Sequence, residues 1–399
     1  MRRKISLLLV MALALSTLPN VALAEDAKVT GAAAEAASAN EPKIYELSIE
    51  DAVKMATEND RGMWKIDDGI KQLQDARKAG KTAKDQAELL MGLPLEVISS
   101  MEIDITNNYV DTLLAKNGYY ITLADTKMKE LEKNRELLLK GIEIEAKSLY
   151  YSVLLAEKTI EINNAKLSKS NEQLRVVTLK FNTGTATRAE VLSAEMAVQQ
   201  AKTDLDSAAD DLNMAKLDLL NKLDLPFDSE IVLKDKELTY VPTAEIDLNA
   251  AIEKAKLERP EILTAENNLE LQKIVTHANT AYYTSNLRQH KAAEEQLKDA
   301  ELNVPQAYKD VELDVRKSYL NLVKDERTLA NMDKTVELAK EAARINKLLY
   351  DNGMATSLDV LEADTGLAQA EIGRYQLLIK YNISRLLFDN SNILGSSAR

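Results

Sequence analysis

Apolar residues recur every seven positions over long stretches of this chain, a period that predicts long helices packed as coiled coils. After residue 190, large apolar side chains and alanines occupy the two seam positions of successive heptads. The large residues are Val191, Val198, Leu205, Leu212 and Leu219, and the alanines are Ala194, Ala201, Ala208 and Ala215. A seven-residue period indicates a left-handed supercoil, and alanine at one seam position lets the partner helix approach closely.

Three further seams follow the same period. One precedes the first and contains Val153, Ile160, Leu167, Leu174 and Phe181, and a similar one contains Leu322, Leu329, Val336, Ala343 and Tyr350. The last seam contains Val360, Ala363, Leu367 and Ala370, and then Arg374 and Tyr381. Either this last helix is less tightly packed than the others or its polar residues face a lumen. A single hairpin of such arms, each about 50–60 Å long, leaves apolar surface uncovered, so hairpin must pack on hairpin within or between chains.

The two arms of each hairpin are joined by nearly the same turn. Residues 181–192 read FNTGTATRAEVL and residues 350–361 read YDNGMATSLDVL, an offset of 169 (350 − 181). A second pair of similar segments opens each half, at Leu47–Ala56 and Ile246–Ala255, with an offset of 199 (246 − 47). Ser48 is the expected N-cap of the first opening helix, with the Asp51 carboxylate in its first turn. The chain is therefore a duplicated helical hairpin whose first half has about 30 additional residues, between Ala56 and about Ile142.

These patterns predict an all-α or nearly all-α protein with few or no strands. Residues 1–24 have a basic start, an apolar run over 5–15 and an Ala-Leu-Ala cleavage site, as in a signal peptide; the alternative is an uncleaved anchor. Residues 25–43 are a flexible leader, 44–226 the first helical repeat, 227–245 a linker, 246–392 the second repeat and 393–399 a tail. The linker contains two candidate short strands, Ile231–Leu233 and Leu238–Val241.

Composition and charge narrow the function classes. The formal net charge is −13, or −16 without the three basic residues of the signal segment (−13 − 3), which makes nucleic acid and anionic membrane surfaces poor candidate partners. The chain has no cysteine, which excludes disulfides and a thioether lipid on the mature N-terminus. After the signal segment, no run reaches the ~20 apolar residues of a transmembrane helix.

No catalytic, cofactor or metal site is expected from the residues. His277 and His290 are 13 positions apart (290 − 277), too far for adjacent helical turns, and phosphate loops, paired Cys/His spacings and nucleophile elbows are absent from the sequence. The pairs Tyr119-Tyr120, Tyr150-Tyr151 and Tyr282-Tyr283 are interpreted as packing between helices, and Trp64 as a packing anchor. We therefore expect a protein that is not an enzyme.

The turn glycines, Gly184 and Gly353, allow a positive φ and a close approach of another backbone. The alternative is that they are simple helix C-caps. Asp359 and Glu362 follow the second turn. If several such carboxylates converged, they would repel one another, which would raise their pKa values, and they would favour cations. They can equally be ordinary first-turn acids stabilised by the helix dipole, and both interpretations can hold together.

The sequence resembles the TolC family of outer-membrane efflux channel proteins. The resemblance covers most of the mature chain. It rests on the two opening helices, on the doubled turn (aromatic-x-x-Gly-x-x-Thr/Ser-x-x-Glu/Asp-Val-Leu) and on the Leu-Asn-x-Leu-x-Leu-Pro segment at residues 220–226. It implies that three chains form a twelve-helix tunnel and that the two turns form its periplasmic tip. The implied partners are a membrane-fusion adaptor and an inner-membrane pump or ABC transporter.

The resemblance also assigns roles to individual residues. The implied adaptor-docking residues are Thr183, Gly184, Thr185, Asn352, Gly353 and Met354. The implied tunnel constriction consists of Tyr350, which restrains the closed state, and of Asp359, Glu362 and Glu190. This sequence departs from the family at Ala355, where members can have an arginine that locks the tip, so closure by that ion pair is in doubt.

The strands with which the family crosses the outer membrane are reduced or missing in the sequence. Such strands need about 9–11 residues that alternate apolar and polar side chains. The corresponding window of the second half, 282–304, is charged and favours helix. In the first half only Glu102–Thr106 and Tyr119–Leu123 have strand-like patterns. Contact with an outer membrane is therefore in doubt.

The sequence thus predicts an exported, trimeric tunnel in the cell envelope that serves as the exit duct of an efflux or type I secretion system. In a cell with two membranes it would lie in the periplasm and outer membrane, and in a cell with one membrane it would be extracytoplasmic. The alternative is a non-conducting coiled-coil scaffold or spacer that has the same fold. No cofactor and no nucleic acid are expected.

Overall fold

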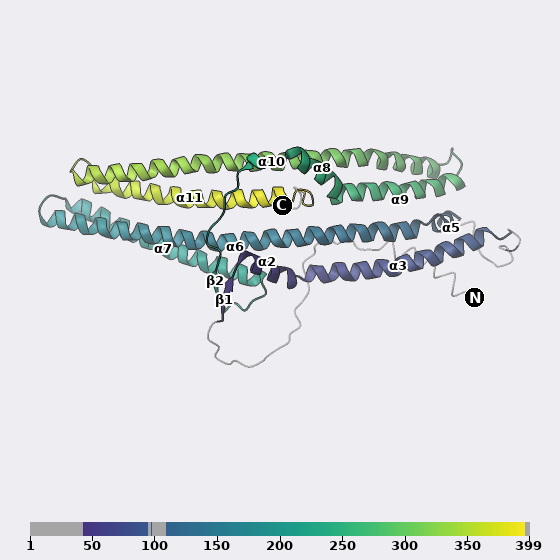
Figure 1. Ribbon diagram of the computed structural model, residues 1–399, viewed down its shortest axis with the longest axis horizontal. Helices are drawn as coiled ribbons and strands as arrows, with labels where there is room; N and C mark the ends of the chain where they lie inside the picture. Colours follow the sequence, from purple (N-terminus) through teal and green to yellow (C-terminus); the bar gives the residue numbers. More distant parts are fainter. Residues whose placement is uncertain (1–42, 95–96, 98–108, 396–399) are drawn as a thin grey trace. The chain divides into compact units, whose positions relative to one another are not determined.

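The computed structural model describes residues 43–94, 97 and 109–395, and almost all of them are helical (Figure 1). The elements of the first half are β1 (Ile44–Leu47), α2 (Ile49–Glu58), α3 (Arg61–Met91), α5 (Tyr109–Lys116), α6 (Tyr119–Asn182), α7 (Arg188–Lys222) and β2 (Glu230–Leu233). Those of the second half are η1 (Thr243–Glu245), α8 (Leu248–Glu258), α9 (Pro260–Tyr282), α10 (Arg288–Asp351) and α11 (Ser357–Asp389). The predicted fold class, nearly all-α with long hairpins, is confirmed.

The described residues form two compact units, and neither unit coincides with one sequence repeat. The first contains α3, α5, the start of α6, α9 and the start of α10, over residues 61–136 and 258–310. The second contains residues 42–60, 137–257 and 311–399, and so the two glycine turns and both short strands. The signal segment and most of the leader lie outside the described residues.

The second unit is built from two antiparallel helical hairpins, α6–α7 and α10–α11, and α7 packs on α11. Much of the predicted seams is buried: Val191, Ala194 and Val198 of α7 are buried, as are Leu322 and Leu329 of α10. Phe181, the last residue of the seam on α6, is 39% exposed. At 35 residues, α7 is about 52 Å long. In the last seam, Tyr381 is fully buried, and Arg374 forms an ion pair with Asp333 of the facing helix. Whether Arg374 faces a lumen depends on an assembly of several chains, so that alternative stays a prediction.

The additional residues of the first half lie in the first unit. Helix α3 has 31 residues where its counterpart α9 has 23, and α5 packs between them, in contact with both. The strand-like pattern at Tyr119–Leu123 proved wrong as a strand, because these residues begin α6. The Gly118 turn just before them starts the helix, with Thr122 donating a backbone hydrogen bond to the Gly118 carbonyl (3.0 Å). Glu102–Thr106 lies outside the described residues, and residues 288–304 are helical, as expected.

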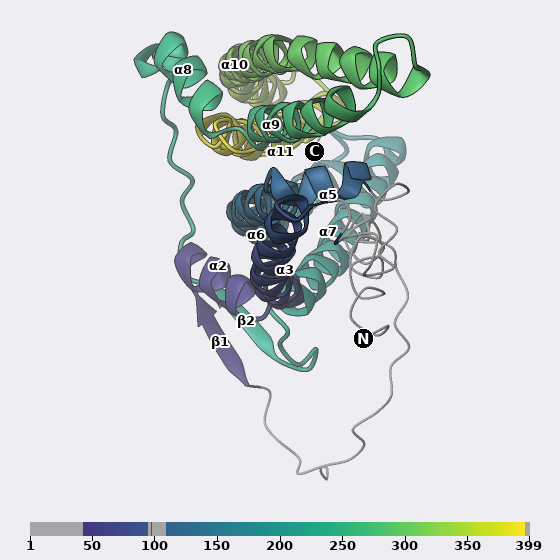
Figure 2. The same ribbon diagram turned by 90° about the vertical axis from the view of Figure 1, so that its right-hand side faces the viewer.

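One of the two candidate linker strands is confirmed. Residues 230–233 form β2, which pairs in parallel with β1, with Tyr45 opposite Ile231 (Figure 2). The sequence did not reveal β1, because four residues are too few for a clear alternation. The other candidate, Leu238–Val241, is not a strand. The predicted N-cap is confirmed: the Asp51 amide donates to Ser48 Oγ (3.1 Å), and the Ser48 amide donates to Asp51 Oδ2 (3.2 Å).

The linker is fastened to both hairpins. Tyr150 of α6 is fully buried, donates its hydroxyl proton to the Leu47 carbonyl (3.1 Å) and accepts from the Asp235 amide (3.0 Å). At the other end, Glu326 of α10 accepts hydrogen bonds from the Tyr240 hydroxyl (2.7 Å) and the Thr243 amide (2.9 Å). These contacts could not be predicted from local sequence patterns, because they join positions more than 80 residues apart.

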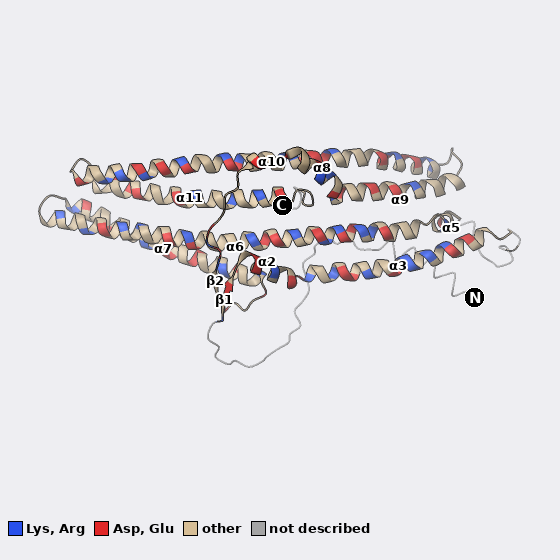
Figure 3. Ribbon diagram, viewed as in Figure 1, with Lys and Arg blue, Asp and Glu red and all other residues tan. Residues whose placement is uncertain are grey.

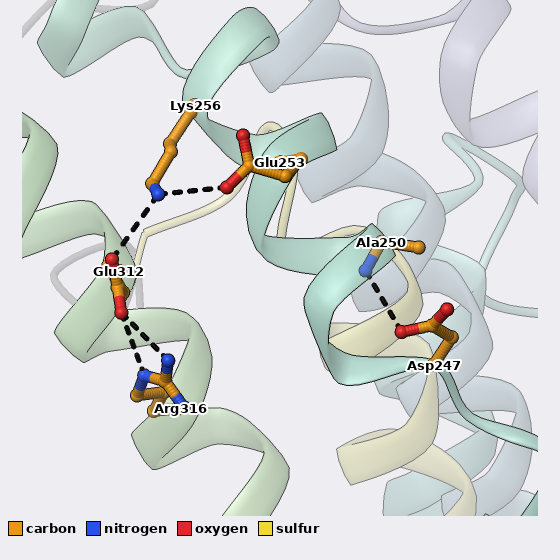
Figure 4. A network of polar contacts seen from close by, with 6 residues as sticks. All are labelled: Asp247, Ala250, Glu253, Lys256, Glu312 and Arg316. Atoms are coloured by element: carbon orange, nitrogen blue, oxygen red, sulfur yellow. Dashed lines mark hydrogen bonds and ion pairs between the residues drawn. The ribbon is translucent and has the colours of Figure 1, made fainter.

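A polar network attaches α8 to α10 (Figure 4). Lys256 bridges Glu253 of its own helix (2.9 Å) and Glu312 of α10 (3.3 Å). Glu312 also accepts from the Arg316 guanidinium (2.8 Å), and these hydrogen bonds lower its pKa. Helix α8 begins where Asp247 Oδ1 accepts from the Ala250 amide (3.1 Å), which caps the predicted second opening helix.

Alkaline pH is expected to destabilise the second unit through Tyr150. Burial raises the pKa of Tyr150 from its ordinary value of 10.0 to about 12. The unfolded chain therefore loses this proton at a lower pH than the folded chain. The contribution to stability is complete below pH 10 and is lost as the pH rises towards 12. Denaturant midpoints measured across this range should fall, and Tyr150→Phe should make the fall shallower; equal slopes would contradict the assignment.

Candidate functional site

Both glycine turns end their incoming helices with the same hydrogen bonds. Gly184 has φ +78° and Gly353 has φ +71°. The Gly184 amide donates to the Phe181 carbonyl (2.9 Å) and the Thr185 amide to the Lys180 carbonyl (2.8 Å). Gly353 and Met354 make the equivalent bonds to Tyr350 (3.1 Å) and Leu349 (2.8 Å). This pattern is the Schellman motif, so the C-cap interpretation of both glycines is confirmed.

The polar side chains of the turns complete these caps. The hydroxyls of Thr183 (2.9 Å) and Thr185 (3.0 Å) donate to the Lys180 carbonyl, and the Asn352 amide donates to the Leu348 carbonyl (2.7 Å). All six predicted docking residues are exposed, and Met354 is 69% exposed. Their exposure permits contact with a partner, and docking itself stays a prediction.

The acidic residues after each turn form capping boxes. Glu190 accepts from the backbone amide (2.6 Å) and hydroxyl (2.9 Å) of Thr187, and the Glu190 amide donates back to the hydroxyl. Asp359 makes the same pair of contacts with Thr356, at 2.7 Å each. The Thr-x-x-Glu/Asp spacing is the sequence signal that predicts them.

In the single chain, the hydrogen bond from the Thr356 amide, with that from its hydroxyl, lowers the pKa of Asp359. Glu362 lies one turn further along α11 and is exposed. The first-turn interpretation of Asp359 therefore fits the structure. Convergence of these acids with a raised pKa requires several chains, and it stays a prediction.

The tips of the two hairpins pack side by side through one apolar cluster, which we call the tip cluster. It consists of Val177, Val191, Tyr350 and Val360, with Ala186 and Ala355 against it. The Lys180 ammonium lies 3.7 Å from the centroid of the Tyr350 ring, a cation–π contact between the hairpins. Ala355, the position where the sequence departs from the family, is therefore part of an apolar contact between the tips.

Polar contacts continue the junction behind the tip cluster. Gln173 of α6 donates to Ser357 Oγ of α11 (3.0 Å), with both side chains buried. Lys169 forms an ion pair with Asp364 (2.7 Å). A cavity of about 500 Å³ lies beside these contacts; its lining includes Lys340 and Arg344 of α10. Tyr350, Asp359 and Glu190 were candidate residues from the sequence. Gln173, Ser357 and Lys180 were not.

Apolar side chains remain exposed around the tips. In the first hairpin they are Leu179 (52%), Phe181 (39%) and Leu192 (46%). In the second they are Leu348 (48%), Met354 (69%) and Leu358 (51%). This concentration of exposed apolar surface beside two well-formed caps is typical of a protein–protein contact.

Other expectations from the sequence can be compared with the described residues. No group of three or more His, Asp or Glu side chains there is placed to hold a metal ion. Among the same residues, no helix is both long enough and apolar enough to cross a membrane. Trp64, expected to be a packing anchor, is 70% exposed, so that expectation was wrong.

Alanine at Gly184 should destabilise the tip without a steric clash. A Cβ at Gly184 would have no atom within 4 Å, so the cost is the left-handed backbone alone, about 1–2 kcal/mol. Gly366 is the matched control: it lies inside α11, also with open space around it, and alanine there should stabilise by up to about 1 kcal/mol. Urea unfolding measures the change in the free energy of unfolding of each variant. If Gly184→Ala left that free energy unchanged, the left-handed backbone at Gly184 would not carry the expected cost.

Comparison with known proteins finds similarity at the level of structure. No protein-family model matches the chain, and no curated protein matches its sequence. Solved structures of TolC-family outer-membrane channels do match. CusC has a TM-score of 0.62 at 12% identity, over 87% of this chain and 92% of its own. OprN has a TM-score of 0.62 at 11% identity, over 88% and 91%. The open state of the MtrE channel of Neisseria gonorrhoeae has a TM-score of 0.54 at 14% identity, over 88% and 89%.

At these identities the similarity establishes a shared fold. The predicted resemblance to TolC-family channels is therefore confirmed in fold. These structural neighbours are channel proteins of the envelope rather than enzymes.

Proposed function

We propose that this protein is the exit duct of an efflux or type I secretion system. Three copies would form a helical tunnel in the cell envelope, with the signal segment directing export. The paired glycine turns would dock a membrane-fusion adaptor connected to an inner-membrane pump or ABC transporter. The observation that carries the proposal is the tip: two Schellman turns held together by the tip cluster and surrounded by exposed apolar side chains.

Trimer formation is supported by a second apolar stripe. On α10, Leu313 (50% exposed) and Leu320 (64%) are one heptad apart, and so are Leu338 (72%) and Ile345 (42%). The inner seam of α10 is already occupied by α11, so these residues form a separate seam. A second copy of the chain would cover it by the same coiled-coil packing.

The constriction residues would act in the assembled tunnel. Tyr350 lies in the contact between the tips, and in the assembled tunnel it would restrain the distance between the two hairpins. Glu362 is exposed, and Asp359 is exposed apart from its cap. In the tunnel that the resemblance implies, three copies of each would place six carboxylates near one axis. Such a ring would favour cations over anions.

Site-specific photo-crosslinking in cells tests the docking proposal. A photoreactive residue at Thr185 or Met354 should cross-link to an envelope coiled-coil protein with its own membrane anchor. The same residue at Leu257, which is 87% exposed on α8, should not. Leucine in place of Gly184 and Gly353 should reduce the cross-link. An equal yield at Leu257, or no reduction by the glycine variants, would contradict docking at the turns and favour a scaffold.

A further inference from the structure

Helix α10 contains a proline in its interior, Pro305. Proline has no backbone N–H, so the Glu301 carbonyl cannot receive the helical hydrogen bond from residue 305, and the proline ring crowds that carbonyl. Helix α6 has the same length of 64 residues in the first repeat and contains no proline. Since proline is one of the few causes of helix kinks of more than about 20°, α10 has a position at which it can bend and α6 has no such proline.

The packing of α10 around Pro305 is loose. None of its side chains from residue 294 to 310 is buried, whereas Ala293 and Val311 on either side are buried. An open groove of about 420 Å³ lies between α9 and this stretch, and its lining includes Ala265 and Asn303. Charged residues of both signs occur along the stretch, as along the other helices (Figure 3). Because buried apolar contacts are few here, local motion of the helix is permitted.

The two flanks of the proline are held by different helices. Before it, the Thr276 hydroxyl of α9 donates to the Ala293 carbonyl of α10 (2.9 Å). After it, Lys256 of α8 forms an ion pair with Glu312 of α10 (3.3 Å). Helices α8 and α9 are separate, with a break at Arg259. The earlier flank of α10 can therefore move with α9 while the later flank stays on α8.

One hydrogen bond joins α9 to the later flank as well. The Tyr308 hydroxyl donates to Glu266 Oε1 of α9 (2.8 Å). This hydrogen bond raises the pKa of Tyr308, so the phenol stays protonated at neutral pH. Helix α9 thus contacts α10 on both sides of the proline, like a splint. Glu266 is exposed and Tyr308 only partly buried, so water competes for this hydrogen bond and the contact can open.

We propose that α10 bends at Pro305 and that the hydrogen bond between Tyr308 and Glu266, which we call the latch, limits the bend. When the latch opens, residues 288–304 tilt together with α9, and the break at Arg259 lets them do so without unfolding. Residues after 311 keep their contact with α8. This conformational device does not depend on the proposed tunnel.

Distances between pairs of spin labels test the bend, since the chain has no cysteine of its own. Asp299→Cys/Lys317→Cys spans the proline, and Leu302→Cys/Leu320→Cys spans it on another face of the helix. Lys317→Cys/Thr335→Cys is the control pair on the same helix after the proline. All five positions are exposed, and each pair is 18 positions apart, about five turns and about 27 Å. Dilution with unlabelled chain restricts the measurement to distances within one chain.

The variant Tyr308→Phe removes the latch and keeps the ring. It should broaden the distances across the proline and shift them by about 2–4 Å, because a label stands off the axis of a helix that bends by about 20°. The control pair should not change. Tyr319→Phe, which removes another hydroxyl from α10, should leave all three pairs unchanged.

The double variant Pro305→Ala/Tyr308→Phe places the bend. It should have the narrow distances of the unsubstituted chain, because alanine restores the helical hydrogen bond to the Glu301 carbonyl. Distances across the proline that Tyr308→Phe leaves unchanged would overturn the proposal. Broadening that persists in the double variant, or that appears equally in the control pair, would also overturn it, because the motion would then not arise at Pro305.

Discussion

Replacing Tyr350 by alanine is expected to separate the tips of the two hairpins. The side chain is 4% exposed, packs in the tip cluster and lies under the Lys180 ammonium. Truncating a buried aromatic residue costs about 3–5 kcal/mol where the surroundings cannot collapse. Here that cost falls on the contact between the hairpins rather than on either hairpin alone. The polar contacts Gln173–Ser357 and Lys169–Asp364 would then hold the junction without the cluster.

Spin labels measure this separation directly. The chain has no cysteine, so Thr183→Cys and Asn352→Cys give one label on each turn without background. With Tyr350→Ala the distance distribution should broaden and move to longer distances. Tyr350→Phe keeps the ring and is the control. A distribution that Tyr350→Ala leaves unchanged would show that the cluster does not restrain the tips.

Replacing Tyr150 by alanine is expected to cause the largest loss of stability, about 3–5 kcal/mol. The ring is fully buried in the core formed by the two strands, α2, α6 and α7. Its hydroxyl also satisfies the Leu47 carbonyl and the Asp235 amide. Tyr150→Phe keeps the ring but leaves the Asp235 amide without this partner, which costs about 1–3 kcal/mol, while the Leu47 carbonyl still accepts from the Lys234 amide (2.9 Å).

Denaturant unfolding of the three proteins separates the packing contribution from that of the hydroxyl. Tyr319→Phe is the matched control, because Tyr319 is the counterpart of Tyr150 in the second repeat (319 − 150 = 169) and its ring packs near Phe388 (5.8 Å). It should change the free energy of unfolding less than Tyr150→Phe does. If the two phenylalanine variants changed the free energy of unfolding equally, the hydrogen bonds of the Tyr150 hydroxyl would not hold the linker on the hairpin.

The helical part of this fold could be predicted because its signals are local. The heptads after Val191 and the doubled glycine turn set the helix faces and the helix ends within a few residues of sequence. The pairing of β1 with β2 could not be predicted, since each strand has four residues and the two are separated by most of the first repeat. The contacts of Glu326 with the linker could not be predicted either, because they also join residues far apart in the sequence.

The candidate site was predictable to a similar extent. The glycine caps follow from sequence, and so do the capping boxes, whose Thr-x-x-Glu/Asp spacing is visible at Thr187 and Thr356. The tip cluster depends on how two hairpins meet, and no local pattern specifies that Lys180 lies over Tyr350.

Three copies of the chain in one hollow assembly are the central claim of this account. Light scattering of the chain without residues 1–24, combined with negative-stain images, tests it most directly. We expect the mass of a trimer and end-on views with a central opening. A monomeric rod without an opening would contradict the duct, and it would leave the coiled-coil scaffold as the function of this fold.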